Sequence, residues 1–284
     1  MIFKYDFWHA WNQTSLYAQY PSEFFDSNHY GPFFSIIIAS FYCIEKEKDI
    51  TAACFIMIGT FVKLYGIVGL AFFFSKHKVK FVAALIGWAV LFFVLPMAIT
   101  SPEYIIDQYK EWHVSLAGKN MENMFSNMQN QSLLGLVRKI SHVSTYSDLW
   151  LIVPGILLFC YPYLRIRQYG NLAFRYAFLA SVLMFVVLFS TGCESSTYII
   201  ALLGVTLWYV TAPWKRSRWD VALMVFAFIL TSMSPSDLFP AFIRKNYVQP
   251  YALKALPCVL IWFKLVYEMM TKDYLTPQNV SEEK

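Results

Sequence analysis

Apolar runs separated by short polar linkers recur along the whole chain, and their lengths predict helices. The longest run extends from Thr51 to Phe74, which is enough for one crossing of a bilayer. The pattern predicts helices at residues 32–44, 51–74, 81–100, 149–164, 174–192, 198–212, 221–233 and 251–270. The fold class expected from this pattern is all-α.

The run over 51–74 is unusual because both of its flanks, 46–48 and 76–80, are basic and Lys63 lies at its centre. Cytoplasmic segments carry the Lys/Arg excess, so both flanks are expected on the cytoplasmic side. A single straight span cannot return to the side that it left. We therefore expect a broken, re-entrant helix pair that rises to Lys63 and then descends. An ammonium at membrane depth is costly unless it is paired, which makes Lys63 a candidate functional residue.

With this turn, every basic cluster of the chain falls on one side of the membrane, whereas a straight span would divide the clusters between two sides. The expected organisation is a single transmembrane domain over 1–284. Its parts are an outer-face loop (1–31); a short helix, the broken pair and a full span (32–100); an outer-face loop with interfacial helical pieces at 102–112 and 127–139 (101–148); five transmembrane helices (149–270); and a cytoplasmic tail (271–284).

The composition agrees with a polytopic integral membrane protein. The chain is 58% hydrophobic and only 14% charged, which excludes an ordinary soluble domain. Its net charge of +5 comes from basic linkers and is a topology signal, so we expect membrane lipids and no nucleic acid as partners. The cysteines form no C-x-x-C pair and the histidines have no metal-ligand spacing. Neither a disulfide framework nor a metal site is expected.

The outer-face loops bring together polar groups that suit acid–base chemistry on a phosphorylated lipid. Lys63 and Arg138 are expected to hold a phosphate, the ammonium as a point charge and the guanidinium as a fork. Asp6 or Asp26 is expected to remove a proton from an attacking hydroxyl. Because side chains already supply the cations, no metal and no cofactor is required beyond the donor substrate.

Each of these residues also has a structural interpretation that the sequence leaves open. Lys63 and Arg138 can snorkel towards an interface. Asp6 lies near the start of the sequence and can simply be solvated, and Asp26 suits a turn or a helix cap.

Further substrate-binding candidates lie in the same outer loops: His29, Tyr30, Asn130, Gln131, Ser132 and Glu194. The aromatic and imidazole rings of the first two suit packing at the membrane interface. The three polar residues at 130–132 either hydrogen-bond sugar hydroxyls or cap the helix that follows. Glu194 suits either a substrate contact or an ordinary loop.

The order of several stretches resembles the bacterial family-87 glycosyltransferases, which belong to the GT-C membrane class. The stretches are HYGPFF, FVKLYGIVGLAFFF with the basic turn after it, SPEYIIDQYKEW, NQSLLGLVRK, LRIRQYGNLAFR and CESSTYIIALLGVTLWY. The similarity extends over residues 1 to 270, and the order of the stretches carries it, because no single motif is decisive.

The resemblance implies a GT-C-like helix bundle and a hexosyltransferase. It implies transfer of a hexose, often mannose, from a polyprenyl-phosphate donor to a lipid or glycan acceptor. The active site would face the periplasm from the bacterial inner membrane. The usual base in this class is an Asp at the outer end of the first helix, and the position here that matches most nearly is Asp6, with Asp26 as the second choice.

The sequence also departs from the family pattern. Family members have a first helix before the point where this sequence begins, and further helices between Ala39 and Glu45. A late start and an internal deletion are therefore expected, and a non-catalytic remnant of the family is one alternative. A transporter or lipid flippase is another, because discontinuous helices with a buried charge are also typical of transporters. Transporters usually show paired interruptions in two halves, and this sequence shows one clear interruption.

Overall fold

The computed structural model describes residues 33–62, 64–72, 78–126 and 128–275. Every regular element within these ranges is helical, so the all-α prediction is confirmed. The chain divides into two compact units, Met1–Glu122 and Asn123–Lys284, and each is considered by itself. The organisation of the whole chain as one transmembrane domain stays a prediction.

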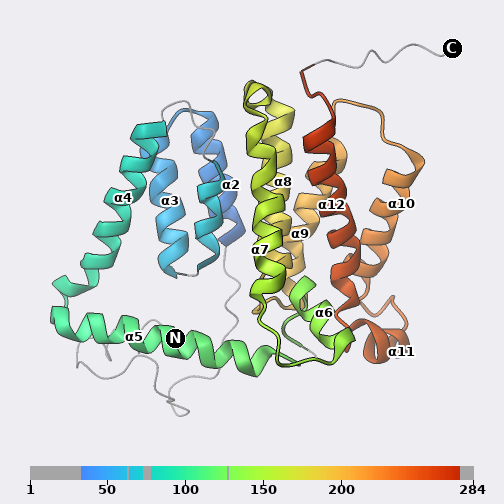
Figure 1. The fold of residues 1–284 in the computed structure, drawn as a ribbon, viewed down its shortest axis with the longest axis horizontal. Coiled ribbons are helices and arrows are strands. Elements are labelled where there is room, and N and C mark those ends of the chain that lie inside the picture. The colour runs from blue at the N-terminus through green and yellow to red at the C-terminus, as the bar shows by residue number, and fades with distance from the viewer. Residues whose placement is uncertain (1–32, 63, 73–77, 127, 276–284) are drawn as a thin grey trace. The chain divides into compact units, whose positions relative to one another are not determined.

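The first unit contains a short helix, a helix pair and two longer helices (Figure 1). In chain order these are α2 (Phe33–Glu45), α3 (Asp49–Val62), the 3-10 helix η1 (Leu64–Phe72), α4 (Lys78–Val94) with its 3-10 continuation η2 (Leu95–Ala98), and α5 (Pro102–Asn123). α2 and α4 confirm the helices expected at 32–44 and 81–100.

The chain doubles back within the run 51–74, as its basic flanks predict. η1 packs antiparallel against α3, because Gly66 lies against Gly59 whereas Gly69, further along η1, lies against the earlier residue Ile56. The approach at Gly66 is between backbones: a Cβ there would lie 2.3 Å from the carbonyl carbon of Gly59. Only glycine allows so close an approach without a shift of the backbone.

The relative directions of α3 and α4 also confirm this turn. The starts of both helices meet, since Ile50 and Lys80 line one groove of about 410 Å³. Their later parts also meet, since the rings of Phe61 and Phe92 lie 6.2 Å apart. α3 and α4 are therefore parallel, and Lys48 lies at the same end as Lys78 and Lys80. α3 ends at Val62 and η1 begins at Leu64, and Lys63 itself lies outside the described residues.

We expect Gly66→Ala to destabilise the first unit by about 1–3 kcal/mol, the usual cost of forcing atoms into a filled space. The added methyl group has no room between η1 and α3. Gly87→Ala in α4 is the matched control, because nothing lies within 4 Å of the Cβ position there. That control should be neutral or stabilise the helix by about 0.5–1 kcal/mol. Thermal unfolding of the two variants in detergent measures the difference, and equal midpoints would contradict the close packing.

Lys78–Ala98 is, in the part of the chain that the structure describes, the single helix that is both long and apolar enough to cross a membrane. Its side chains, among them Val79 and Ile86, are largely exposed. α5 begins after Ser101, whose Oγ accepts a hydrogen bond from the Tyr104 backbone N–H (3.3 Å). It continues well past the expected end at residue 112, to Asn123, and no proline interrupts the added residues.

The second unit contains the other helices (Figure 1, green to red). In chain order these are α6 (Leu133–Ser141), α7 (Leu149–Cys160) with η3 (Tyr161–Leu164), η4 (Ile166–Gly170), α8 (Leu172–Leu188), η5 (Ser195–Thr197), α9 (Tyr198–Val210), α10 (Arg218–Phe226) continuing as the π-helix η6 (Ala227–Met233), α11 (Ala241–Ile243), η7 (Arg244–Val248), η8 (Leu253–Ala255) and α12 (Leu256–Thr271). The short helices α11 and η7 lie in a segment that the sequence pattern leaves as a loop.

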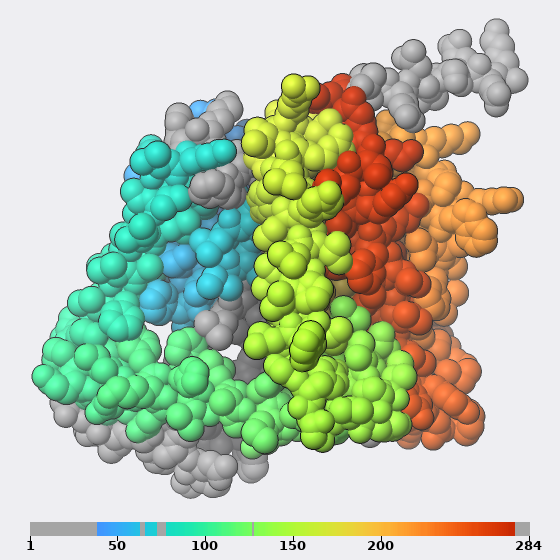
Figure 2. All heavy atoms as spheres, viewed as in Figure 1, coloured from blue at the N-terminus to red at the C-terminus, as the bar shows by residue number. Residues whose placement is uncertain are grey.

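The core of the second unit forms around α8, which is buried along most of its length. α9 approaches it closely at Gly204, where a Cβ would lie 2.8 Å from the Ala180 carbonyl oxygen. α12 joins it through the indole N–H of Trp262, which donates to Ser181 Oγ (3.0 Å). The side chains of α12 and α7 fill the face of this unit that Figure 2 shows in red and yellow-green.

Polar contacts gather at the two ends of these helices. At one end, the segment before α6 bonds to Cys193 and Gln249, and Lys254 bonds to Ser195. At the other end, the segments 165–171 and 269–274 bond to each other. This separation agrees with the alternating direction of the helices expected from the sequence. Which end faces the periplasm stays a prediction.

Candidate functional site

The structure describes about half of the predicted site residues. Asp6, Asp26, His29, Tyr30 and Lys63 lie outside the described residues, and their roles stay predictions. Those that it describes are Asn130, Gln131, Ser132, Arg138 and Glu194, all in the second unit. These five lie at the end where the segments before α6, η5 and α12 meet. We refer to this region as the loop end of the second unit.

The residues before α6 are buried and shape the start of that helix. Ser132 is its N-cap: its Oγ accepts from the Gly135 backbone N–H (3.2 Å) and donates to Asn130 Oδ1 (3.1 Å). Asn130 has a left-handed backbone (φ 50°), a conformation that asparagine tolerates better than most residues. Gly135 must be glycine, since a Cβ there would lie 1.6 Å from the Asn130 carbonyl oxygen. The capping interpretation therefore holds for Ser132, and α6 starts at Leu133 instead of near residue 127.

Gln131 joins three segments that are distant in sequence. Its backbone N–H donates to the Cys193 carbonyl (2.8 Å), and its side-chain amide donates to the Gln249 carbonyl (3.0 Å). Its own carbonyl accepts from the Tyr198 hydroxyl (2.5 Å). With 3% of its surface exposed, Gln131 fixes the loop end from inside. A role in sugar binding stays a prediction.

Arg138 is 2% exposed and is held by the segment between α6 and α7. One terminal nitrogen donates to the Ser144 carbonyl (2.9 Å), and the other to the Tyr146 carbonyl (3.1 Å) and to Asp148 Oδ1 (2.6 Å). The guanidinium also stacks on the Tyr146 ring, 4.3 Å from its centre. Its fork is thus occupied by protein atoms, and its role as a phosphate ligand stays a prediction.

The segment after α8 contains Glu194, which is partly buried. The Glu194 backbone N–H donates to Thr197 Oγ1 (3.2 Å), an arrangement that fixes the turn into α9. Ser195, next to Glu194, accepts hydrogen bonds from the Lys254 ammonium at its carbonyl (2.7 Å) and at its hydroxyl (2.8 Å). Lys254 also lies over the Tyr198 ring, 5.1 Å from its centre.

Lys139 and Lys254 are buried cations at the loop end that our sequence interpretation missed. Both are almost inaccessible, and burial lowers the pKa of each ammonium to about 8. Lys139 donates to the Gln129 carbonyl (3.1 Å). A sequence signal for Lys254 was present, because it interrupts the apolar run 251–270 much as Lys63 interrupts 51–74. The structure starts α12 at Leu256, which places Lys254 just before that helix.

The first unit has an apolar groove where α4 meets α5. Its volume is about 490 Å³, and its lining includes Phe93, Tyr109, Lys110 and His113. The Phe93 and Tyr109 rings stack with 4.7 Å between their centres. The groove lies at the end of α4 near the turn of the α3–η1 pair, since the adjacent Phe92 contacts Phe61. An apolar surface of this kind can accept a hydrocarbon chain.

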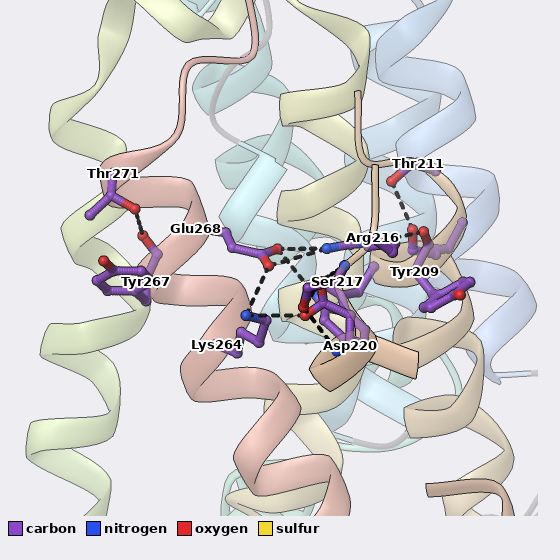
Figure 3. Close-up of polar contacts among 11 residues, drawn as sticks. Tyr209, Thr211, Arg216, Ser217, Asp220, Lys264, Tyr267, Glu268 and Thr271 are labelled. Atoms are coloured by element: carbon purple, nitrogen blue, oxygen red, sulfur yellow. Dashed lines mark hydrogen bonds and ion pairs between the residues drawn. The ribbon is translucent and has the colours of Figure 1, made fainter. Parts of the chain in front are cut away.

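The opposite end of the second unit carries a buried ion network (Figure 3). Arg216 donates to both Glu268 carboxylate oxygens (3.1 and 3.0 Å), and Lys264 bridges Glu268 and Asp220 (3.7 and 3.1 Å). The Trp208 indole N–H also donates to Glu268 (2.8 Å). The two cations and two carboxylates balance each other. We therefore assign this network a structural role in joining α9, α10 and α12.

The described residues are helical in every regular element, and one long apolar helix with several shorter ones indicates a membrane protein. A family model described as "Glycosyltransferase family 87" matches residues 23–191, more than half of the chain. The chain therefore belongs to glycosyltransferase family 87, and the resemblance found in the sequence is confirmed. No curated protein and no solved structure matches the chain.

The matched range is shorter than the stretch 1 to 270 over which we recognised the resemblance. It includes Asp26, Lys63 and Arg138, and it ends before Glu194. Asp6 lies before its start. Within the described residues, no group of three or more His, Cys, Asp or Glu side chains could hold a metal ion.

Proposed function

We propose that this chain transfers a hexose, with mannose as the first candidate, from a polyprenyl-phosphate donor to a lipid or glycan acceptor. In this proposal the site faces the periplasm from the bacterial inner membrane. Membership of glycosyltransferase family 87 is the observation that carries the proposal. The reversal between α3 and η1 supports it, because a broken helix pair within 51–74 is what the phosphate role of Lys63 requires.

The proposed reaction is a single displacement. The acceptor hydroxyl oxygen attacks the anomeric carbon, and the bond from that carbon to the phosphate oxygen breaks. Asp6 takes the hydroxyl proton, with Asp26 as the second candidate for this base. Polyprenyl phosphate leaves with the bonding electron pair.

Lys63 is the first candidate to stabilise the charge that grows on the leaving phosphate. Arg138 is the second, since its terminal nitrogens are already bonded inside the protein. The other predicted contacts to donor or acceptor are those of His29, Tyr30, Asn130, Gln131, Ser132 and Glu194.

The direct test compares Lys63→Ala with Lys80→Ala in membranes supplied with a radiolabelled polyprenyl-phosphate sugar. Losing one charge-stabilising group should slow transfer by about 10- to 100-fold in Lys63→Ala. Lys80→Ala should transfer at the wild-type rate, because Lys80 is exposed at the opposite end of α4.

Equal rates in wild type and Lys63→Ala would reject the phosphate role of Lys63. Absence of any labelled product from the wild type would reject the transferase proposal. If purified protein in vesicles instead moved the labelled lipid across the bilayer without a covalent product, the flippase alternative would replace it.

A further inference from the structure

The short helices α11 and η7, between η6 and α12, turn large apolar side chains outward. They occupy residues 241–248, outside the range that the family model matches. Four apolar side chains on and next to them are between 42% and 82% exposed: Leu238, Phe242, Ile243 and Tyr247. We refer to these four side chains as the edge patch. An apolar patch that a folded segment keeps exposed marks a contact surface.

The edge patch lies on a segment whose backbone is fixed. Val248 of η7 is buried. Arg244 folds back along the segment, and its guanidinium donates to the carbonyls of Pro235 and Ser236 (both 3.1 Å). The same arginine lies in the helical turn that carries Phe242. The exposure of the patch is therefore a property of the folded segment and does not come from a free loop.

The helix before this segment has an outward apolar face of its own. Along α10 and η6, the exposed residues Val221, Val225 and Phe228 recur at helical spacing, whereas Ala227 and Thr231 are buried. A helix of a membrane protein that turns such a face outward presents it to lipid. The edge patch follows this face in the chain, and α11 lies at the end of η6 in Figure 1.

The length of α10 and η6 sets the depth of the segment that follows them. They comprise nine and seven residues, so at 1.5 Å per residue they rise about 24 Å at most. The hydrocarbon core is about 30 Å thick. Trp219, exposed beside Arg218 at the start of α10, suits one membrane interface. Measured from that interface, the residues after Met233 reach only the far edge of the hydrocarbon, short of free water.

We infer that residues 238–248 lie in the boundary between lipid headgroups and acyl chains, and that the edge patch contacts the acyl chains of the bilayer. A helical segment suits this depth, because lipid offers no hydrogen bonds to the backbone. The bond from the Gln249 backbone N–H to the Arg244 carbonyl (3.0 Å) is one that η7 supplies itself. Exposed Lys245 suits this depth too, since its ammonium can extend to the headgroups. A second protein is the alternative occupant, which the experiment distinguishes.

The test places an environment-sensitive fluorophore on the edge patch of the full-length protein in lipid nanodiscs. Phe242→Cys and Leu238→Cys are labelled in a background with Cys54→Ser and Cys160→Ser, because the other described cysteines are buried. Asp237→Cys is the matched control, since its side chain is fully exposed next to Leu238. Three quenchers are compared: iodide in the water, a lipid with a nitroxide near its headgroup, and a lipid with a nitroxide near its chain end.

The headgroup-proximal nitroxide should quench the two patch labels at least about threefold more than the control label, and iodide should quench them about threefold less, as for an apolar face buried just below the headgroups. Phe242→Cys removes a ring that packs on Tyr247, 6.2 Å between centres. Leu238→Cys leaves that ring pair in place, so it decides the result if Phe242→Cys fails to fold.

Iodide quenching of the patch labels equal to that of the control would overturn the inference, because the patch would then face water. Protection from iodide and from both nitroxide lipids would also overturn it, since a protein would then cover the patch. Stronger quenching by the chain-end nitroxide would place the segment deeper in the hydrocarbon and reject the boundary assignment. None of these measurements needs sugar transfer, so the result is independent of the proposed function.

Discussion

Glu268→Ala should lower the thermal unfolding midpoint of the protein in detergent by roughly 10 °C. The substitution leaves Arg216 buried without its carboxylate, and it removes the acceptor of the Trp208 indole N–H. Breaking a buried ion pair from one side typically costs about 3–5 kcal/mol, and each kcal/mol shifts the midpoint of a chain of this size by about 2–4 °C. This decrease in the unfolding midpoint should exceed the decrease caused by removing any surface charge.

Two further variants give this expectation its controls. Asp237→Ala removes a carboxylate whose only described ion pair, with Arg244, is long at 3.9 Å and exposed. It should change the midpoint by less than about 2 °C, because exposed pairs contribute about 0–1 kcal/mol. The double variant Arg216→Met with Glu268→Met replaces both charges with apolar groups and should recover most of the stability. If the double variant is no more stable than Glu268→Ala, the pair is not the source of the effect.

Arg138→Met should be the second large destabilisation, of about 3–5 kcal/mol. Its guanidinium holds Asp148 and the carbonyls of Ser144 and Tyr146 at the same time, and a methionine leaves all three without their donor. Arg138→Lys should recover only part of the loss, since an ammonium lacks the planar fork. Arg167→Met, an exposed arginine in η4, should have an unfolding midpoint close to that of the wild type.

The same variant separates two roles of Arg138. Sugar transfer by Arg138→Met is measured well below its unfolding midpoint, where the folded fraction is near that of the wild type. A purely structural residue gives normal transfer under those conditions. A residue that also contacts the phosphate gives transfer reduced by at least about tenfold. The result therefore decides whether Arg138 binds the donor phosphate in addition to its structural contacts.

The hydrophobic pattern and the basic linkers were sufficient for most of the helices. They were also sufficient for the turn within 51–74, because two basic flanks require both ends of that run on one side. The hydrophobic pattern and the basic linkers were insufficient where a single residue sets the backbone conformation at a helix end. α6 starts later than its apolar pattern suggests, since Asn130 adopts a left-handed conformation and Ser132 caps the helix. α5 runs further than expected, because no proline interrupts residues 113–123 and the helix continues through Gly118.

Candidate site residues were harder to predict from the sequence than helices. The rule that a charge inside an apolar run is functional selected Lys63, yet the same rule applies to Lys254, Lys264 and Glu268. Structure separates these cases by their partners. Lys264 and Glu268 belong to a balanced ion network, whereas Lys254 has only neutral acceptors among the described residues.

The sequence by itself determined the helical class, the order of apolar helices and polar ends, and the family, because these depend on local hydropathy and on charges counted along the chain. Only the tertiary structure decided which cations are paired. Arg138 and Lys139 are neighbours in sequence and equally buried, yet one meets Asp148 and the other meets a backbone carbonyl. The physical reason is that a buried charge depends on groups brought within a few ångströms by folding, and adjacent side chains of one helix point to different surroundings.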